Sequence, residues 1–118
     1  MSQLVFITGA SSGIGQALAW RYYQAGFSLA LVARRTEEIE AWARLRGLDL
    51  ARYQVYSADV AEVDNIVNAT QQCLQRQGVP DVVIANAGIS IGMDTAIRND
   101  LDVMTRTFAV NNVGLAAS

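Results

Sequence analysis

The feature that most constrains the fold is the alternation of short apolar runs with longer segments of helical periodicity. We predict strands at residues 4–8, 28–33, 52–57 and 81–86, and residues 29–32 and 82–85 are apolar throughout. Continuous apolar runs of this length are typical of parallel strands that are covered on both faces. Apolar residues recur at helical spacing within 14–25, 39–43 and 63–74, and a glycine follows each segment. The sequence therefore predicts an α/β fold in three layers, a doubly wound parallel sheet between helices.

Length and composition bound the possible functions. The 118 residues fit one domain, and 52% hydrophobic with 17% charged residues is typical of a globular protein. A net charge of −2 gives no footprint for nucleic acid. The single cysteine, Cys73, excludes an internal disulfide and a cysteine zinc site, and we read it as a small core residue. Residues 1–7 contain neither a basic segment nor a long apolar one, so we expect no signal peptide, no membrane span and a cytoplasmic protein.

The chemistry begins at residues 8–15, TGASSGIG, which join the first predicted strand to the first predicted helix. Glycines allow positive φ and a close approach of the backbone, and the amides at a helix N-terminus favour a pyrophosphate. An ordinary tight turn is the alternative interpretation. The position on the first strand of a β-α-β unit favours dinucleotide binding, because dinucleotide folds carry their glycine turn there.

This turn resembles the Thr-Gly-x-x-x-Gly-x-Gly pattern of the short-chain dehydrogenase/reductase family. Three further motifs follow in order: Asp59 resembles the family's aspartate at the adenine ring, residues 86–88 resemble its Asn-Ala-Gly motif, and Asn111 resembles the asparagine of its catalytic tetrad. The resemblance runs from residue 3 to residue 118. It implies a Rossmann-like NAD(P)-binding domain with strand order 3-2-1-4.

The choice of cofactor is predicted from the end of the second strand. An acidic residue there would bind the ribose hydroxyls of NAD, whereas this chain has Ala33 followed by Arg34 and Arg35. A guanidinium offers a planar, permanently charged partner for a phosphate, which favours NADP(H) and makes Arg34 the better candidate. The alternative is a solvated pair of surface arginines.

Each candidate also has a structural interpretation. Asp59 could cap the helix that begins near Glu62, and Asn86 could be a buried amide that is merely satisfied. Asn111 falls on one helix face with Leu101, Met104 and Phe108, so it should have hydrogen-bond partners. The predicted cofactor-binding residues are Gly9, Ser11, Ser12, Gly13, Ile14, Gly15, Arg34, Arg35, Asp59, Val60, Asn86, Ala87 and Gly88. Asn111 is the one predicted catalytic residue, and no metal site is predicted.

The resemblance implies an NADP(H)-dependent oxidoreductase that transfers hydride to or from a small carbonyl or alcohol substrate. The family's catalytic serine and its Tyr-x-x-x-Lys pair are absent from these residues, which contain no lysine. We therefore expect an incomplete domain that stops after the fourth strand and the following helix and is inactive alone. A noncatalytic nucleotide-binding or sensing module is the alternative. In such an incomplete domain the fourth strand would lie at an open edge of the sheet, where another chain could pair with it. We therefore expect a homo-oligomer.

Overall fold

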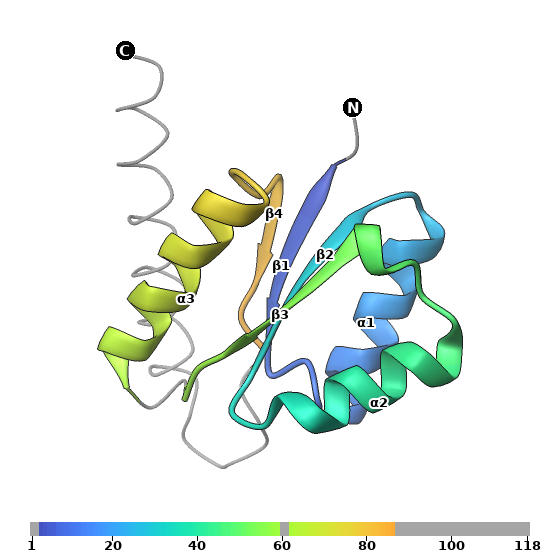
Figure 1. Cartoon of the computed structure of the whole chain (residues 1–118), viewed down its shortest axis with the longest axis horizontal. Helices are drawn as coiled ribbons and strands as arrows, with labels where there is room; N and C mark the ends of the chain where they lie inside the picture. The colour runs from blue at the N-terminus through green and yellow to red at the C-terminus, as the bar shows by residue number, and fades with distance from the viewer. Residues whose placement is uncertain (1–2, 60–61, 87–118) are drawn as a thin grey trace.

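The computed structural model describes residues 3–59 and 62–86, and these residues form a parallel sheet with helices on both faces (Figure 1). The elements in chain order are β1 (Leu4–Thr8), α1 (Gly13–Gln24), β2 (Ser28–Ala33), α2 (Thr36–Arg46), a 3-10 helix (Leu50–Arg52), β3 (Tyr53–Ser57), α3 (Val63–Arg76) and β4 (Val82–Ile84). Figure 1 shows α1 and α2 on one side of the sheet and α3 on the other. The three-layer α/β prediction is confirmed.

The sheet has the order β3-β2-β1-β4, and all three strand pairs are parallel. This is the order that the resemblance implied. The first two strands match the predicted bounds, whereas β3 begins one residue later because Arg52 ends the 3-10 helix. Arg52 donates from Nη2 to the carbonyls of Tyr23 and Phe27, both at 2.8 Å.

The strand β4 is shorter than the predicted 81–86, and contacts that involve a side chain flank it at both ends. The Asp81 carboxylate accepts a hydrogen bond from the Leu4 amide at 2.8 Å, and the Asp81 amide donates to the Leu4 carbonyl at 2.8 Å. At the other end the Asn86 amide donates to the Thr8 hydroxyl at 3.0 Å. These bonds fix β4 beside β1 from both directions.

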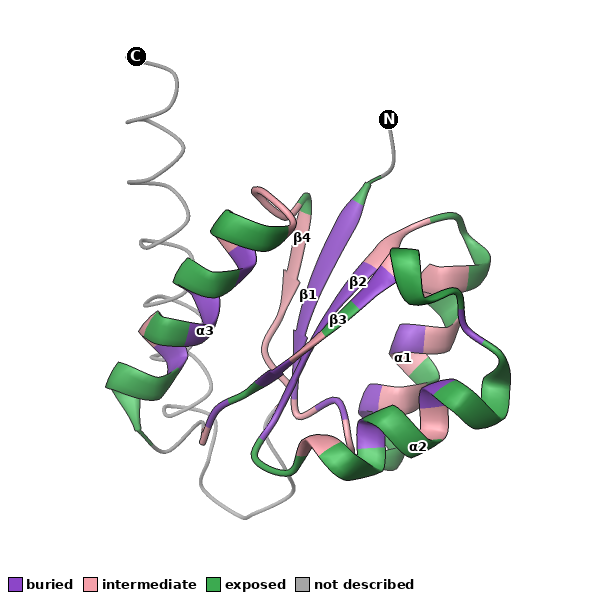
Figure 2. Ribbon diagram, viewed as in Figure 1, coloured by how far each residue is buried: buried purple, intermediate pink, exposed green. Residues whose placement is uncertain are grey.

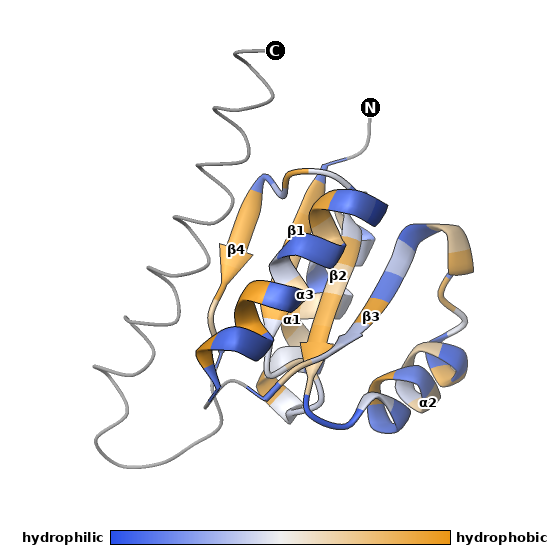
Figure 3. Ribbon diagram, turned by 60° about the vertical axis from the view of Figure 1, so that its left-hand side comes forward, coloured by the Kyte–Doolittle hydropathy of each residue, from blue (hydrophilic) through white to orange (hydrophobic). Residues whose placement is uncertain are grey.

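Alternation along the strands divides the core into two layers, and the strands carry most of its fully buried side chains (Figure 2). Leu4 and Phe6 pack on the α3 side, whereas Val5 and Ile7 pack on the α1 and α2 side. The helices have polar outer faces (Figure 3). A central strand with both faces buried explains why its sequence is apolar throughout.

The glycines at 26, 47 and 78 lie within two residues of a helix end and have φ values of 96°, 72° and 101°. The predicted helix ends are therefore confirmed. The apolar pattern predicted for α1 is only partly correct, since Ile14 is 59% exposed and Ala17 and Ala25 are also exposed. The residues of α1 that are buried are Gly15 and Ala19. Small residues face the sheet because the helix lies close to it. None of the described helices has the length and apolarity needed to cross a membrane.

The tightest contact of α1 is at Gly15, in its first turn. A Cβ atom there would meet the Gly9 carbonyl oxygen, would lie 2.9 Å from Ala10 Cα and would lie 3.1 Å from Asn86 Nδ2. Gly13, two residues earlier, has no neighbouring atom within 4 Å of such a Cβ among the described residues. Of these two glycines of α1, Gly15 is the one that the packing requires.

We predict that Gly15→Ala lowers the free energy of unfolding by at least about 1–3 kcal/mol. The added methyl would overlap the Gly9 carbonyl and crowd Ala10 and the Asn86 side chain. Gly13→Ala is the matched control, and it should leave stability unchanged or slightly raised because alanine favours a helix. Urea denaturation of both variants measures the difference. Equal stability of the two variants would contradict the close approach at Gly15.

Cys73 is fully buried between α3 and the sheet, beside Tyr56. Burial raises the pKa of the Cys73 thiol to about 12, from an ordinary value of 9.0. Burial likewise raises the pKa of the Tyr56 phenol, whose hydroxyl donates to Gln77 Oε1 at 2.8 Å. Both groups are therefore neutral in the folded protein at neutral pH, and the thiol is a core residue as predicted.

The raised pKa of Cys73 predicts a loss of stability in alkali. Between about pH 9 and 12 the unfolded thiol releases its proton while the folded thiol retains it, so stability falls as pH rises. The slope of this contribution approaches ~1.4 kcal/mol per pH unit. Cys73→Ala should reduce that slope in denaturation measured from pH 7 to 11. An identical pH slope in both proteins would show that the folded thiol titrates normally.

Candidate functional site

The predicted site residues meet at the carboxyl ends of β1, β2 and β3. A hollow of about 460 Å³ opens there, and its wall comes from the glycine turn, the end of β2, the first turn of α2 and the end of β3. The lining residues are Gly9, Ser11, Ser12, Ala33, Arg34, Glu38, Ala58 and Asp59. We call this hollow the strand-end pocket. A larger hollow of about 770 Å³ lies between α2 and β3, but none of the predicted site residues lines it.

The glycine turn is shaped by hydrogen bonds around Ser12, the N-cap of α1. Ser12 Oγ donates to the Gly9 carbonyl at 2.9 Å and accepts from the Gly15 amide at 3.0 Å. Ser12 Oγ accepts a second bond from Asn86 Nδ2 at 3.0 Å. A hydroxyl has only one hydrogen, and Ser12 uses it inside the turn. Ser12 therefore lines the pocket but its hydroxyl serves the turn.

Asn86 connects the end of β4 to this turn. Its amide nitrogen Nδ2 donates to the Gly9 carbonyl at 3.3 Å as well as to Ser12 Oγ, which uses both hydrogens of the group. Gly9 has φ 63°, and a Cβ there would collide with the Asn86 backbone. These hydrogen bonds agree with the interpretation of Asn86 as a satisfied amide. The partners of Asn86 belong to the predicted phosphate-binding turn.

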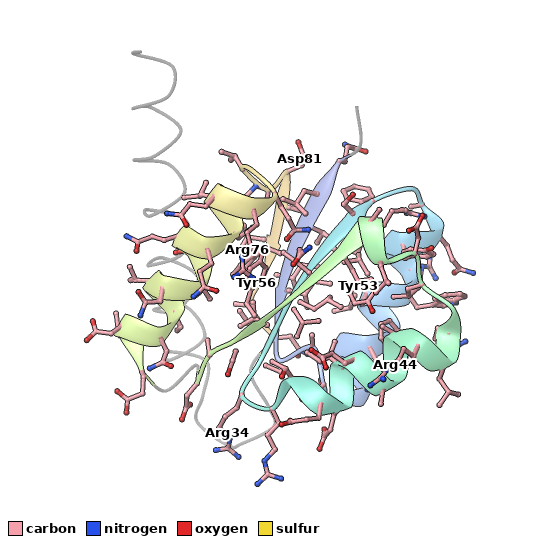
Figure 4. The ribbon with its side chains drawn as sticks, viewed as in Figure 1. Arg34, Arg44, Tyr53, Tyr56, Arg76 and Asp81 are labelled. Carbon is pink, nitrogen blue, oxygen red and sulfur yellow. The ribbon has the colours of Figure 1, made fainter. Side chains whose placement is uncertain are left out.

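The two arginines after β2 differ in position. Arg34 lines the strand-end pocket, whereas Arg35 does not and is the N-cap residue of α2. Both side chains are exposed. Figure 4 shows Arg34 in the loop between β2 and α2, reaching outward from the sheet. Ala33, which is buried at the end of β2, leaves the position of the family's acidic residue without a carboxylate.

Asp59 follows β3 and lines the pocket. Its carbonyl accepts from the Glu62 amide at 2.9 Å, and Glu62, not Asp59, is the N-cap residue of α3. The sequence analysis missed Glu38, which lines the pocket from the first turn of α2. A carboxylate four residues beyond Arg34, at the start of a predicted helix, was the available signal.

The remaining predicted residues fall in two groups. Gly13 and Ile14 begin α1 but do not line the pocket. Val60, Ala87, Gly88 and Asn111 lie outside the described residues. Within residues 3–59 and 62–86, histidine, cysteine and acidic side chains form no group of three or more that could hold a metal ion.

The chain is similar to known proteins both in sequence and in fold. Residues 3–117 match the family model for short chain dehydrogenases. A Drosophila melanogaster protein, dehydrogenase/reductase SDR family protein 7-like, is 38% identical over an alignment of 119 positions that covers 98% of this chain and 36% of that protein.

Three solved structures share the fold. A Brucella melitensis short-chain dehydrogenase/reductase matches with a TM-score of 0.78 and 22% identity, over 91% of this chain and 50% of that one. A 3-ketoacyl-(acyl-carrier-protein) reductase from the same organism, solved with NADH, matches with a TM-score of 0.71 and 24% identity. The match covers 88% of this chain and 47% of that one. L-sorbose reductase from Gluconobacter frateurii, solved with NADPH and L-sorbose, matches with a TM-score of 0.74 and 22% identity. The match covers 91% of this chain and 46% of that one.

The chain spans about a third of the length of the Drosophila relative and about half of each of these structures. The family match nevertheless covers nearly all of the residues present, including the turn at 8–15 and the strands that carry the pocket. This chain belongs to the short-chain dehydrogenase family.

Proposed function

We propose that the strand-end pocket holds the adenosine and phosphate end of NADP(H), and that the protein transfers hydride between NADPH and a carbonyl or alcohol substrate. One observation carries the proposal: the glycine turn, Arg34 and Asp59, which are far apart in sequence, line one pocket. The family to which the chain belongs supports the oxidoreductase assignment.

Each part of the nucleotide has a chemical partner in this proposal. The pyrophosphate lies against the turn and the N-terminus of α1, where backbone amides and the helix dipole favour an anion. Ser11 supplies a hydroxyl from the pocket wall, because that of Ser12 is engaged within the turn. Asp59 accepts from the adenine amino group. Gly13 leaves space at the first residue of α1 for close approach of a phosphate.

The choice of NADP(H) rests on Arg34. Solved neighbours include one complex with NADH and one with NADPH, so the fold accommodates both nucleotides. Arg34 lines the pocket directly after Ala33, the position from which a carboxylate would bind the ribose of NAD, and its guanidinium is a suitable partner for a phosphate. A charged hydrogen bond to a 2′-phosphate is available only to NADP(H).

Arg34→Ala should weaken NADPH binding about tenfold and leave NADH binding within about twofold, because only NADPH carries the 2′-phosphate. Titration calorimetry with both nucleotides measures the selectivity. Arg35→Ala is the matched control: it removes an equal charge from the adjacent exposed position, outside the pocket wall. Equal losses for NADPH and NADH in Arg34→Ala would refute the assignment of the 2′-phosphate to this residue.

The chain contains no lysine, so the family's Tyr-x-x-x-Lys pair is absent from these 118 residues. We propose that they bind nucleotide without catalysing hydride transfer. Positioned acid–base groups contribute about 100- to 10,000-fold to such reactions, and a carbonyl polariser contributes further. Purified chain mixed with NADPH and a panel of ketones should therefore show no NADPH oxidation above the rate without ketone. Ketone-dependent oxidation that is abolished by Asn111→Ala would contradict this.

A further inference from the structure

The strand-end pocket contains an unexpected negative charge beside its cation. Three charged residues line its wall: the cationic Arg34 and the acidic Glu38 and Asp59. Asp59 lies after β3, at the end proposed for the adenine ring. Glu38 lies in the first turn of α2, four residues beyond Arg34, and both residues line the pocket together with Ala33, the last residue of β2.

We propose that Glu38 is a specificity-determining residue that opposes Arg34 at the 2′ position, so that the pocket accepts NAD(H) as well as NADP(H). This inference rests on the proposed function, since it assumes that the nucleotide occupies the pocket as described above. Glu38 is exposed and lines the same wall as Arg34. A 2′-phosphate drawn to Arg34 would then bind in a pocket that Glu38 also lines.

The interactions among the described residues do not neutralise the negative charge of the Glu38 carboxylate. Among the described residues no salt bridge joins Arg34 to Glu38, and Ser57 Oγ donates to the backbone carbonyl of Arg34 at 3.4 Å, a bond that does not involve the guanidinium. A carboxylate without a cation partner repels a second anion over a range set by the ionic strength, about 10 Å at 0.1 M salt. Like charges in one binding site raise the cost of binding.

Glu37 provides a matched control. Both residues lie in the first turn of α2, where a carboxylate favours the positive end of the helix. Both are exposed, and substitution of either by glutamine removes one negative charge and the same favourable helix contact. Only Glu38 lines the pocket, so the two variants differ in their distance from the bound nucleotide.

The test compares NADP⁺ and NAD⁺ binding by the 118-residue chain, Glu38→Gln and Glu37→Gln at low and high salt. We expect Glu38→Gln to tighten NADP⁺ binding about two- to fivefold at low salt, with NAD⁺ changed less than about twofold. Glu37→Gln should leave the ratio of the two affinities unchanged. The gain in Glu38→Gln should shrink as added salt screens the repulsion.

The outcomes separate this inference from the proposed function. If wild-type protein binds both nucleotides and Arg34→Ala is selective for NADP⁺, but Glu38→Gln and Glu37→Gln behave alike, the role of Glu38 is refuted while the site stands. If Glu38→Gln strengthens NAD⁺ and NADP⁺ equally, the carboxylate does not read the 2′ position. If wild-type protein binds neither nucleotide, the proposed function fails and the role of Glu38 fails with it.

Discussion

The contact on which the rest of the site depends is the junction of Asn86 with the glycine turn. The side chain of Asn86 donates both of its hydrogens to that turn, and its backbone lies against Gly9. The first strand and the fourth strand are neighbours in the sheet, so their carboxyl ends meet at this point. The turn therefore has its shape because a strand more than seventy residues later is in place.

This junction explains why roles within the eight-residue turn are unequal. Gly9, Ser12 and Gly15 build the turn, although Gly9 and Ser12 also line the pocket: Gly9 has positive φ, the Ser12 hydroxyl is engaged in hydrogen bonds, and Gly15 makes a close backbone contact. Ser11 faces the pocket, and Gly13 has open space beside it. One set of residues builds the turn and another is available to a ligand. A sequence motif lists both sets together, and only the hydrogen bonds distinguish them.

The sequence predicted those parts of the molecule that depend on local chemistry. Continuous apolar runs located β1 and β2 to the residue, and glycines located the helix ends. The errors arose where tertiary contacts decide. The close packing of α1 on the sheet places Gly15 and Ala19 inside and leaves Ile14 exposed, because only small side chains fit there. At Asp81 the side-chain carboxylate accepts from the Leu4 amide of β1, and at Asn86 the backbone amide donates to the Thr8 hydroxyl of β1.

The same distinction between local chemistry and tertiary contacts applies to the site. Arg34 was predictable because its position after β2 is fixed by chain order, but Glu38 reaches the pocket through the turn that starts α2. The helix α2 begins two residues after Arg34, and Glu38, in its first turn, lines the same pocket as Ala33 at the strand end. Charge at the pocket is thus set jointly by a loop and a helix. Because a phosphate responds to the sum of nearby charges and not to one arginine, specificity in such a pocket must be derived from the whole wall.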